Sequence, residues 1–350
     1  MDRVSGLEVC SEVRRHPEHA NVAILLVSSR DSENAIIEGL SHGADDYVVK
    51  PVRIPELVAK VTMALRKKQL EVEMEGGVRV GNVFAGKYEI IRNIGSGGSS
   101  RVYLARNIAA KNAREVALKI YDIPLAKRDA ETFRRRFLRE AYEHSRLKHP
   151  NIVEFYDFGQ HHGDYYMAME YVEGKSLRDV VDDNGQLPIW ELRQLAHCIL
   201  SAIEYLDGQE LIHRDIKPEN IMAVLGGYKL LDFGLSRTRH DHTLSLNNEF
   251  QCTPGFVSPD YILGTQLDSS CDLYSLGLTL WFCATGRLPI PGTEILETLQ
   301  NQIDILPPPL YRECPELPKA FCKLVDDMVK KKPSARPKLE AASKRLNCIV

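Results

Sequence analysis

Long apolar runs are missing from this sequence, and so is any signal for export. A membrane-spanning helix takes about 20 consecutive apolar residues, whereas the most apolar stretch, Leu273 to Ala284, contains Tyr, Ser and Thr and predicts a buried core helix. The N-terminus lacks the apolar segment of a signal peptide. The eight cysteines include no C-x-x-C pair, so neither a disulfide framework nor a zinc site is indicated. We expect a cytoplasmic protein without a membrane span.

An excess of charge of one sign is missing as well. The 45 lysines and arginines against 48 aspartates and glutamates leave a net charge of −3, which gives no electrostatic case for binding nucleic acid. With 44% hydrophobic residues the chain can build real cores, and its 350 residues suggest two domains or one large one.

The first 70 residues differ from the rest in their pattern of apolar residues. Short apolar runs at 23–27 and 47–49 are typical of strands buried on both faces, and the segments 32–42 and 54–70 have helical patterns. Strands that alternate with helices predict a parallel sheet. Residues 71–87 mix charge with four glycines and are expected to form a linker.

From Tyr88 onward, strands come first and helices follow. The pattern predicts two strands joined by a Gly/Ser loop in 88–105, strands at 115–120 and 165–171, a charged helix at 129–148, and mainly helices after residue 190.

The segment Gly95 to Val102 is rich in Gly and Ser and joins two predicted strands. Dinucleotide folds and Walker A loops open a helix instead, so this context argues against both. Residues without a Cβ let backbone amides close over phosphates, and a plain hairpin is the alternative. Ser100 stands where a third glycine is usual in such loops, and its Cβ predicts a loop with fewer accessible backbone conformations.

Lys119 lies within an apolar predicted strand, seventeen residues after Val102. A buried ammonium needs a partner, and Glu140 on the following predicted helix is available. Such a pair would hold the ammonium where it can reach the α- and β-phosphates of a nucleotide.

The most informative run is His213 to Asn220, followed by Asp-Phe-Gly at 232–234. Asp215 can accept the proton of an attacking hydroxyl and orient it toward a γ-phosphorus. Lys217 can neutralise charge on the transferring group, while Asn220 and Asp232 offer the hard oxygen ligands that Mg²⁺ prefers. The run therefore predicts a magnesium-dependent phosphoryl-transfer site.

In this order, the Gly-rich loop, the strand lysine, the catalytic run and the Asp-Phe-Gly resemble the eukaryotic-type protein kinases, including their bacterial members, over residues 88–346. The resemblance implies a two-lobed α+β fold, ATP and Mg²⁺ (or Mn²⁺) as cofactors, and proteins with Ser/Thr hydroxyls as substrates. The residues at two positions, Lys217 and Thr253 in the substrate-facing segment, are similar to those of serine/threonine kinases and not to those of tyrosine kinases. The catalytic residues that it implies are Lys119, Glu140, Asp215 and Lys217.

The resemblance also implies how the nucleotide is held. Met169, which is equally typical of a core residue, would be the gatekeeper of the adenine pocket, and Glu170 and Val172 would offer backbone hydrogen bonds to adenine. The implied ATP contacts are Ile94, Gly95, Ser96, Gly97, Gly98, Ser99, Ser100, Arg101, Val102, Ala117, Lys119, Met169, Glu170 and Val172.

Two further positions depart from the family pattern. Asp260 stands where the family usually has a Glu paired with an arginine, here Arg336, and Asp is one methylene shorter, which predicts a longer ion pair. Cys252 replaces a common glycine. Together with Ser100, these departures are the only support for an alternative, a nucleotide-binding signalling scaffold that transfers poorly.

Arg214, directly before Asp215, resembles kinases that are controlled by phosphorylation of the activation loop. Thr243 and Ser245, near the middle of residues 232–259, are the candidate sites, because a phosphate there could pair with Arg214. The alternative is that both are solvated loop hydroxyls.

Residues 1–70 resemble the second half of a response-regulator receiver domain, a flavodoxin-like α/β fold. Ser28 and Lys50 would be its switch hydroxyl and phosphate-facing lysine, whereas the phospho-acceptor aspartate would fall three residues before Met1. We therefore expect a natural protein that begins roughly 55–60 residues earlier, and apolar faces left uncovered here. An upstream partner in two-component signalling would act through this segment. The alternative of a phosphorelay output protein is disfavoured by the missing acceptor.

Overall fold

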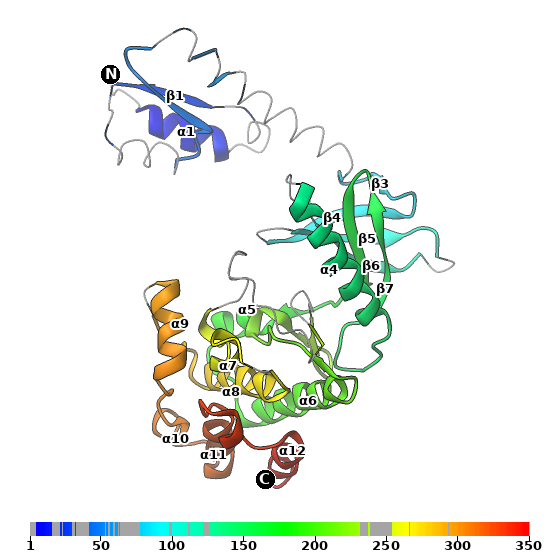
Figure 1. Ribbon diagram of the computed structural model, residues 1–350, viewed down its shortest axis with the longest axis vertical. Coiled ribbons are helices and arrows are strands. Elements are labelled where there is room, and N and C mark those ends of the chain that lie inside the picture. The colour runs from blue at the N-terminus through cyan, green and yellow to red at the C-terminus, as the bar shows by residue number, and fades with distance from the viewer. Residues whose placement is uncertain are drawn as a thin grey trace. The chain divides into compact units, whose positions relative to one another are not determined.

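The computed structural model describes most of the chain (Figure 1). The described residues are 5–15, 22, 24–29, 32, 42–52, 54, 57–58, 60–61, 63, 78–97, 100–110, 113–121, 127–231, 237–238, 254–265, 267–292 and 294–349. The chain divides into two compact units, Met1–Ile91 and Arg92–Val350.

The N-terminal segment contains the predicted parallel pair of strands. After helix α1 (Gly6–Arg15), β1 (Leu25–Ser28) runs parallel to β2 (Asp46–Val49), with Leu25 opposite Asp46. The parallel sheet is thereby confirmed for these two strands. The predicted helix at 32–42 lies almost wholly outside the described residues, whereas those described between 54 and 63 are helical.

The apolar faces of this segment are partly open, as expected. Cys10, Tyr47 and Val48 are buried, but Val27 is 40% exposed and Val58 is 57% exposed. Among the described residues, some apolar side chains of this segment therefore face solvent.

The small lobe is built on a six-stranded sheet with the strand order β3-β4-β5-β6-β8-β7. Its strands are β3 (Val83–Phe84), β4 (Tyr88–Gly97), β5 (Ser100–Asn107), β6 (Glu115–Tyr121), β7 (Phe155–His161) and β8 (Asp164–Glu170). The strands expected from the sequence are confirmed, but β7 was not predicted, and β3 lies in residues expected to form a linker. A register shift between Phe155 and Asp157 breaks the alternation of apolar side chains that would have indicated it.

Helix α4 (Lys127–Ser145) packs on this sheet beside β7 (Figure 1). Phe137 and Ala141 lie one helical turn apart and are buried against Tyr121, Tyr165 and Met167. The rings of Phe137 and Tyr165 are 4.8 Å apart. This cluster holds α4 against the strand that carries the predicted site lysine.

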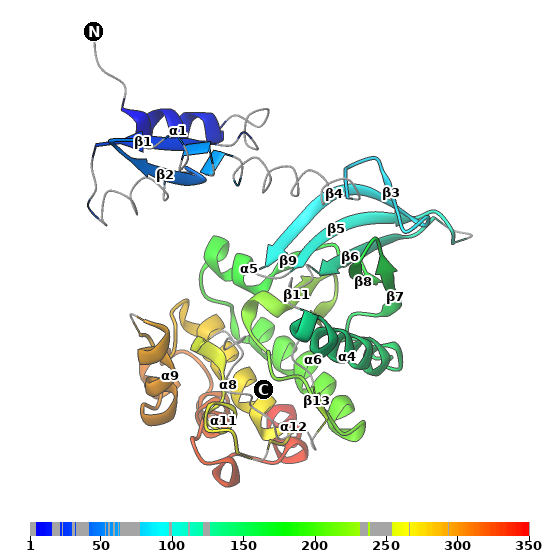
Figure 2. The same cartoon turned by 45° about the horizontal axis from the view of Figure 1, so that its top comes forward.

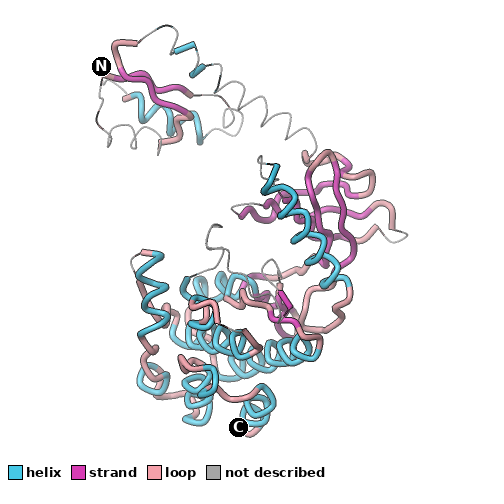
Figure 3. Tube along the Cα trace, in the orientation of Figure 1, coloured by secondary structure: helices cyan, strands magenta, loops and turns pink. Residues whose placement is uncertain are grey.

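The large lobe is mainly helical (Figure 3). Its helices are α5 (Leu177–Asn184), α6 (Ile189–Gly208), α7 (Pro259–Ile262), α8 (Ser270–Thr285), α9 (Ile295–Asp304), α10 (Leu310–Glu313), α11 (Lys319–Met328) and α12 (Leu339–Asn347). A small sheet in the order β12-β11-β9 lies beside α5 (Figure 2), formed by β9 (Lys175–Ser176), β11 (Ile221–Val224) and β12 (Gly227–Leu230).

Helix α8 is the centre of this lobe and confirms the predicted buried core helix, because every residue from Cys271 to Thr285 is buried. A Cβ added to Gly277 would lie only 2.8 Å from the Cβ of Met328 on α11. Glycine is therefore needed for the two helices to approach this closely. Across the part of the chain that the structure describes, no helix has both the length and the apolar character needed to cross a membrane.

Candidate active site

The run His213–Asn220 is a loop between two short strands. β10 (Leu211–Ile212) ends just before it, and a 3-10 turn at Pro218–Asn220 leads directly into β11. The strands therefore fix both ends of the loop, and the side chains with catalytic chemistry lie between them.

A single buried carboxylate anchors the start of this loop. Asp272, in the first turn of α8, accepts hydrogen bonds of 2.8 Å from the backbone N–H groups of both His213 and Arg214. The backbone turns sharply at Arg214, whose φ of 68° lies in the left-handed region that is unfavourable for residues with a side chain. Burial raises the pKa of Asp272, and the nearby His213 and Arg214 oppose that rise. The sequence indicates Asp272 only as the acidic residue that opens the central helix of the large lobe, and its contact with the catalytic loop was not predicted.

His213 connects the loop to the strand end that precedes position 232. Its Nδ1 accepts the backbone N–H of Asp215 at 3.3 Å, and its Nε2 lies 3.0 Å from the backbone oxygen of Leu231. One neutral tautomer, with the proton on Nε2, satisfies both contacts. Leu231 is held a second time, because its N–H donates to the backbone oxygen of Asn220 at 2.8 Å. Asp232 lies outside the described residues, but the residue before it is fixed at the catalytic loop.

Three of the predicted site residues meet at one oxygen atom. Oδ2 of Asp215 lies 2.9 Å from Nζ of Lys217 and accepts a hydrogen bond of 2.7 Å from Nδ2 of Asn220. The same Nδ2 also donates to the backbone oxygen of Asp215 at 2.9 Å. Two donors on one oxygen, one of them cationic, fix the direction in which the carboxylate points.

The amide of Asn220 is suited to a hard cation. Its nitrogen donates two hydrogen bonds to Asp215, one to the backbone oxygen and one to Oδ2. No described residue donates a hydrogen bond to its Oδ1. A carboxamide oxygen of this kind is an oxygen ligand that Mg²⁺ accepts, and a carboxylate at position 232 would be a second one. The residues present therefore fit a magnesium ion.

The predicted nucleotide-binding residues of the sheet are neighbours across its strands. Lys119 is opposite Val102 on one side and Met167 on the other, while Ala117 is opposite Met169. Lys119 is buried, and its Nζ lies 5.3 Å from the ring centroid of Tyr121. Glu140 is half-buried on α4, and its pairing with Lys119 stays a prediction.

The glycine-rich segment joins two strands, as predicted, because it spans the end of β4 and the start of β5. Ser100 is the first residue of β5, opposite Tyr121, and its φ is not positive. A side chain therefore imposes no backbone cost there, and Ser100 does not support the scaffold alternative. The predicted site residues that lie outside the described residues are Gly98, Ser99, Asp232, Thr243, Ser245 and Thr253.

The end of β8, at Glu170, leads into the segment expected to contact adenine and is tied to the large lobe. The Glu170 carboxylate accepts the backbone N–H of Glu154 at 3.1 Å and pairs with the ammonium of Lys229 in β12. The role of Lys229 was not predicted from the sequence. Among the described residues, none accepts a hydrogen bond from the N–H of Val172, so this donor is available to a ligand.

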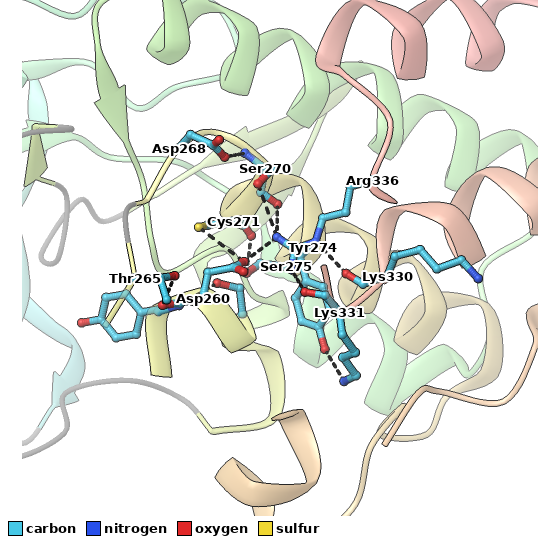
Figure 4. Close-up of polar contacts among 12 residues, drawn as sticks. Asp260, Thr265, Asp268, Ser270, Cys271, Tyr274, Ser275, Lys330, Lys331 and Arg336 are labelled. Carbon is cyan, nitrogen blue, oxygen red and sulfur yellow. Dashed lines mark hydrogen bonds and ion pairs between the residues drawn. The ribbon is translucent and has the colours of Figure 1, made fainter. Parts of the chain in front are cut away.

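The prediction of a long ion pair at Asp260 is wrong. Oδ2 of Asp260 lies 2.6 Å from Nη1 of Arg336, and both side chains are buried (Figure 4). Arg336 also donates to the backbone oxygens of Lys330 at 2.7 Å and Lys331 at 2.8 Å. The shorter Asp side chain reaches because these bonds bring the guanidinium to it. Asp260 therefore gives no support to the scaffold alternative, and Cys252 lies outside the described residues.

Next to this pair, Lys331 has an unusual environment, which leads to a prediction. Its Nζ donates to the Tyr274 hydroxyl at 2.9 Å and to the backbone oxygen of Gln302 at 2.6 Å. Burial, followed by the charge of Arg336, lowers the pKa of Lys331 to about 8 from an ordinary value of 10.5. The unfolded chain thus binds more protons than the folded one between these values, so this group makes the protein more stable as pH rises through that window.

We expect the free energy of unfolding of the wild type, relative to Lys331→Met, to rise by about 1 kcal/mol from pH 7.5 to pH 10, a figure reduced for partial exposure. Urea unfolding at the two pH values measures it. Lys332→Met, at an exposed neighbour, is the control and should keep the wild-type pH dependence. An identical pH dependence for Lys331→Met and the wild type would show that Lys331 has an ordinary pKa.

Comparison with known proteins identifies the family. The protein kinase domain model matches residues 88–346, and the response regulator receiver domain model matches residues 1–62. The chain is 36% identical over 258 residues to the serine/threonine-protein kinase PrkC of Bacillus subtilis, covering 73% of this chain and 39% of that protein. It is 34% identical over 270 residues to the serine/threonine-protein kinase pkn3 of Myxococcus xanthus, covering 74% of this chain and 49% of that one. The chain thus spans less than half the length of these relatives.

Among solved structures, the PknI kinase domain of Mycobacterium tuberculosis is similar, with a TM-score of 0.61 and 26% sequence identity, covering 77% of this chain and 98% of that one. The small lobe built on an antiparallel sheet and the helical large lobe agree with this match. Residues 88–346 make this chain a member of the protein kinase domain family, with a receiver-domain match before it.

Proposed function

We propose that residues 88–346 are a serine/threonine protein kinase that transfers the γ-phosphoryl group of ATP to Ser/Thr hydroxyls of proteins, itself included, with Mg²⁺ (or Mn²⁺). The observation that carries this proposal is the meeting of Lys217 and Asn220 at one carboxylate oxygen of Asp215. The printed names of the kinase relatives support the choice of acceptor.

In this mechanism Asp215 receives the proton of the acceptor hydroxyl and aims the hydroxyl oxygen at the γ-phosphorus. Lys217, fixed beside Asp215, neutralises negative charge on the group in transfer. Asn220 and Asp232 hold the Mg²⁺, which supplies positive charge at the phosphates. The protein thus contributes positioning and electrostatics, which supply most of the acceleration in phosphoryl transfer.

The nucleotide is held by the small lobe and the segment after it. Backbone N–H groups between Gly95 and Val102 close over the phosphates, and Lys119, paired with Glu140, reaches the α- and β-phosphates. Met169 lies at the back of the adenine pocket, while the Glu170 carbonyl and the Val172 N–H bind adenine. The N–H of Val172, which donates to no described residue, supports this assignment.

The test is incubation of the purified chain with labelled ATP, with Mg²⁺ or with a chelator, followed by identification of the phosphorylated residue. Alkali-stable label on threonine, or label recovered as phosphoserine, is expected only with the metal. Hydroxylamine-labile label, which marks an acyl phosphate, would instead support the phosphorelay alternative.

We also propose that phosphorylation of Thr243 or Ser245 activates the kinase. Each phosphate adds roughly −1.5 to −2 charges and could pair with Arg214. Peptide mass spectrometry of active enzyme is expected to find phosphate on Thr243 or Ser245 within residues 236–250, and active enzyme without phosphate on either residue would refute the idea. Thr238→Ala, in the same segment, is the control and should leave activity unchanged.

For the N-terminal part, we propose a partial receiver at 1–70 and a linker at 71–87, which contains strand β3 of the small lobe near its end and through which an upstream signalling protein acts on the kinase. The positions of Ser28 and Lys50 support this reading, because the backbone N–H of Lys50 donates to the backbone oxygen of Ser28 at 2.7 Å. Both residues therefore lie at the carboxyl ends of β1 and β2, where open parallel sheets bind ligands.

A further inference from the structure

The turn η3 (Pro254–Phe256) directly follows Thr253, the predicted substrate-facing residue, and it is held at two points. The ring of Phe256 is buried in the core, edge-on to Phe282 at 6.1 Å. On the other side, the backbone oxygen of Gly255 accepts a hydrogen bond of 2.8 Å from Nε2 of Gln302 on α9. The backbone that leaves Thr253 therefore has little freedom.

Gln302 is fully buried, and both ends of its carboxamide are used. The Tyr274 hydroxyl donates to its Oε1 at 2.8 Å, and Nζ of Lys331 donates to that hydroxyl at 2.9 Å (Figure 4 shows the Tyr274–Lys331 contact). Because the backbone oxygen of Gly255 can only accept, it takes a hydrogen bond from the amide nitrogen of Gln302, and Oε1 of Gln302 is left to accept from the Tyr274 hydroxyl. The amide nitrogen of Gln302 must then face Gly255.

A buried glutamine is costly unless every polar atom is satisfied. Leu299, one turn earlier on α9, is also buried and is apolar, as a core position usually is. The polar residue at 302 is therefore best explained by the group that it binds, a backbone carbonyl in the turn after the substrate-facing residue.

We propose that Gln302 is a positioning residue for the protein acceptor: by holding Gly255 it fixes the segment that the acceptor docks on and sets the affinity for the acceptor. This inference rests on the proposed kinase function. Gln302 lies on α9, the third described α-helix past the catalytic loop, and the hydrogen bonds of its side chain reach no nucleotide-binding residue, so its effect should be confined to the acceptor.

The test compares Gln302→Met, which keeps the length of the side chain and removes its hydrogen bonds, with Gln300→Met. Gln300 is exposed on the same helix and donates to Asp304, so it is a matched control. With casein as acceptor, Gln302→Met should raise the KM for casein about tenfold, since a buried carbonyl loses its donor. The KM for ATP and the slow hydrolysis of ATP without acceptor should stay within about twofold. Tyr274→Phe should change the KM for casein in the same direction by about threefold.

A second measurement does not depend on activity. Amide hydrogen exchange in the peptide around Gly255–Val257 should become about tenfold faster in Gln302→Met than in the wild type or in Gln300→Met. Unchanged exchange, or an unchanged KM for casein, overturns the inference. An equal rise in the KM values for ATP and casein overturns it too, because it indicates a general structural role. A wild type that transfers no phosphate contradicts the proposed function instead, and the exchange result still decides the contact.

Discussion

Asp215→Asn is expected to lower the rate of phosphoryl transfer by about 10³-fold or more, because a general base and the orientation of the attacking group are lost together. Asparagine has the same shape as aspartate, and its Oδ1 can still accept the hydrogen bond that Asn220 donates. It cannot accept a proton, and it pairs more weakly with Lys217. The fold should therefore persist while the chemistry fails.

The measurement is single-turnover transfer from labelled ATP, with stabilisation by ATP and Mg²⁺ against heat as a separate readout of binding. Asp215→Asn should keep the stabilisation by nucleotide, whereas Lys119→Met should lose both binding and transfer. The matched control is Asp183→Asn, an exposed aspartate paired with Lys175 at 2.7 Å, which should transfer at the wild-type rate. More than about a tenth of wild-type transfer in Asp215→Asn would remove this residue from the mechanism.

The parts of this site that sequence could predict are those in which the chemistry is local. Asp215, Lys217 and Asn220 lie within six residues, so a short loop must bring them close whatever surrounds it. The strand lysine was also predictable, because an isolated cation in an apolar run needs a partner. The same holds for the buried helix at 273–284, whose composition alone indicates a core position.

What could not be predicted are the contacts that depend on tertiary structure. Asp272 holds the catalytic loop from more than 50 positions further along the chain, and neither its type nor its spacing marks it as a partner of His213. Lys229, which pairs with Glu170, looks like any strand lysine until β12 and the end of β8 meet. Strand β7 was missed because its bulge destroys the alternation on which strand prediction depends.

The length of the Asp260–Arg336 pair was wrong for the same reason. The prediction considered only the length of the Asp side chain. The distance between two buried charged groups also depends on the other contacts that hold each group in place. Arg336 is fixed by several carbonyls and by the ring of Tyr274, 4.8 Å from its guanidinium carbon. Asp260 needs only to meet a cation that is already in place.

Arg336→Met is therefore expected to destabilise the kinase domain by about 3–5 kcal/mol, because it leaves the buried carboxylate of Asp260 without its cation. The same change removes the donor from the backbone oxygens of Lys330, Lys331 and Ser270. Against a total stability of about 5–15 kcal/mol for a typical protein, this is a large share. The midpoint of thermal unfolding should fall by about 10 °C.

Two comparisons separate the buried charge from ordinary loss of an ion pair. Lys344→Met breaks an exposed pair with Glu340, in which both side chains are at least 74% exposed, and should cost less than about 0.5 kcal/mol. Arg336→Met combined with Asp260→Leu should recover part of the loss, because no unpaired charge is then left in the core. Thermal unfolding of five proteins measures this: the wild type, Lys344→Met, Arg336→Met, Asp260→Leu and the double variant. The double variant could instead lose as much free energy of unfolding as the two single variants together. The loss would then come from packing and backbone hydrogen bonds, and an unpaired Asp260 carboxylate would not explain the effect of Arg336→Met.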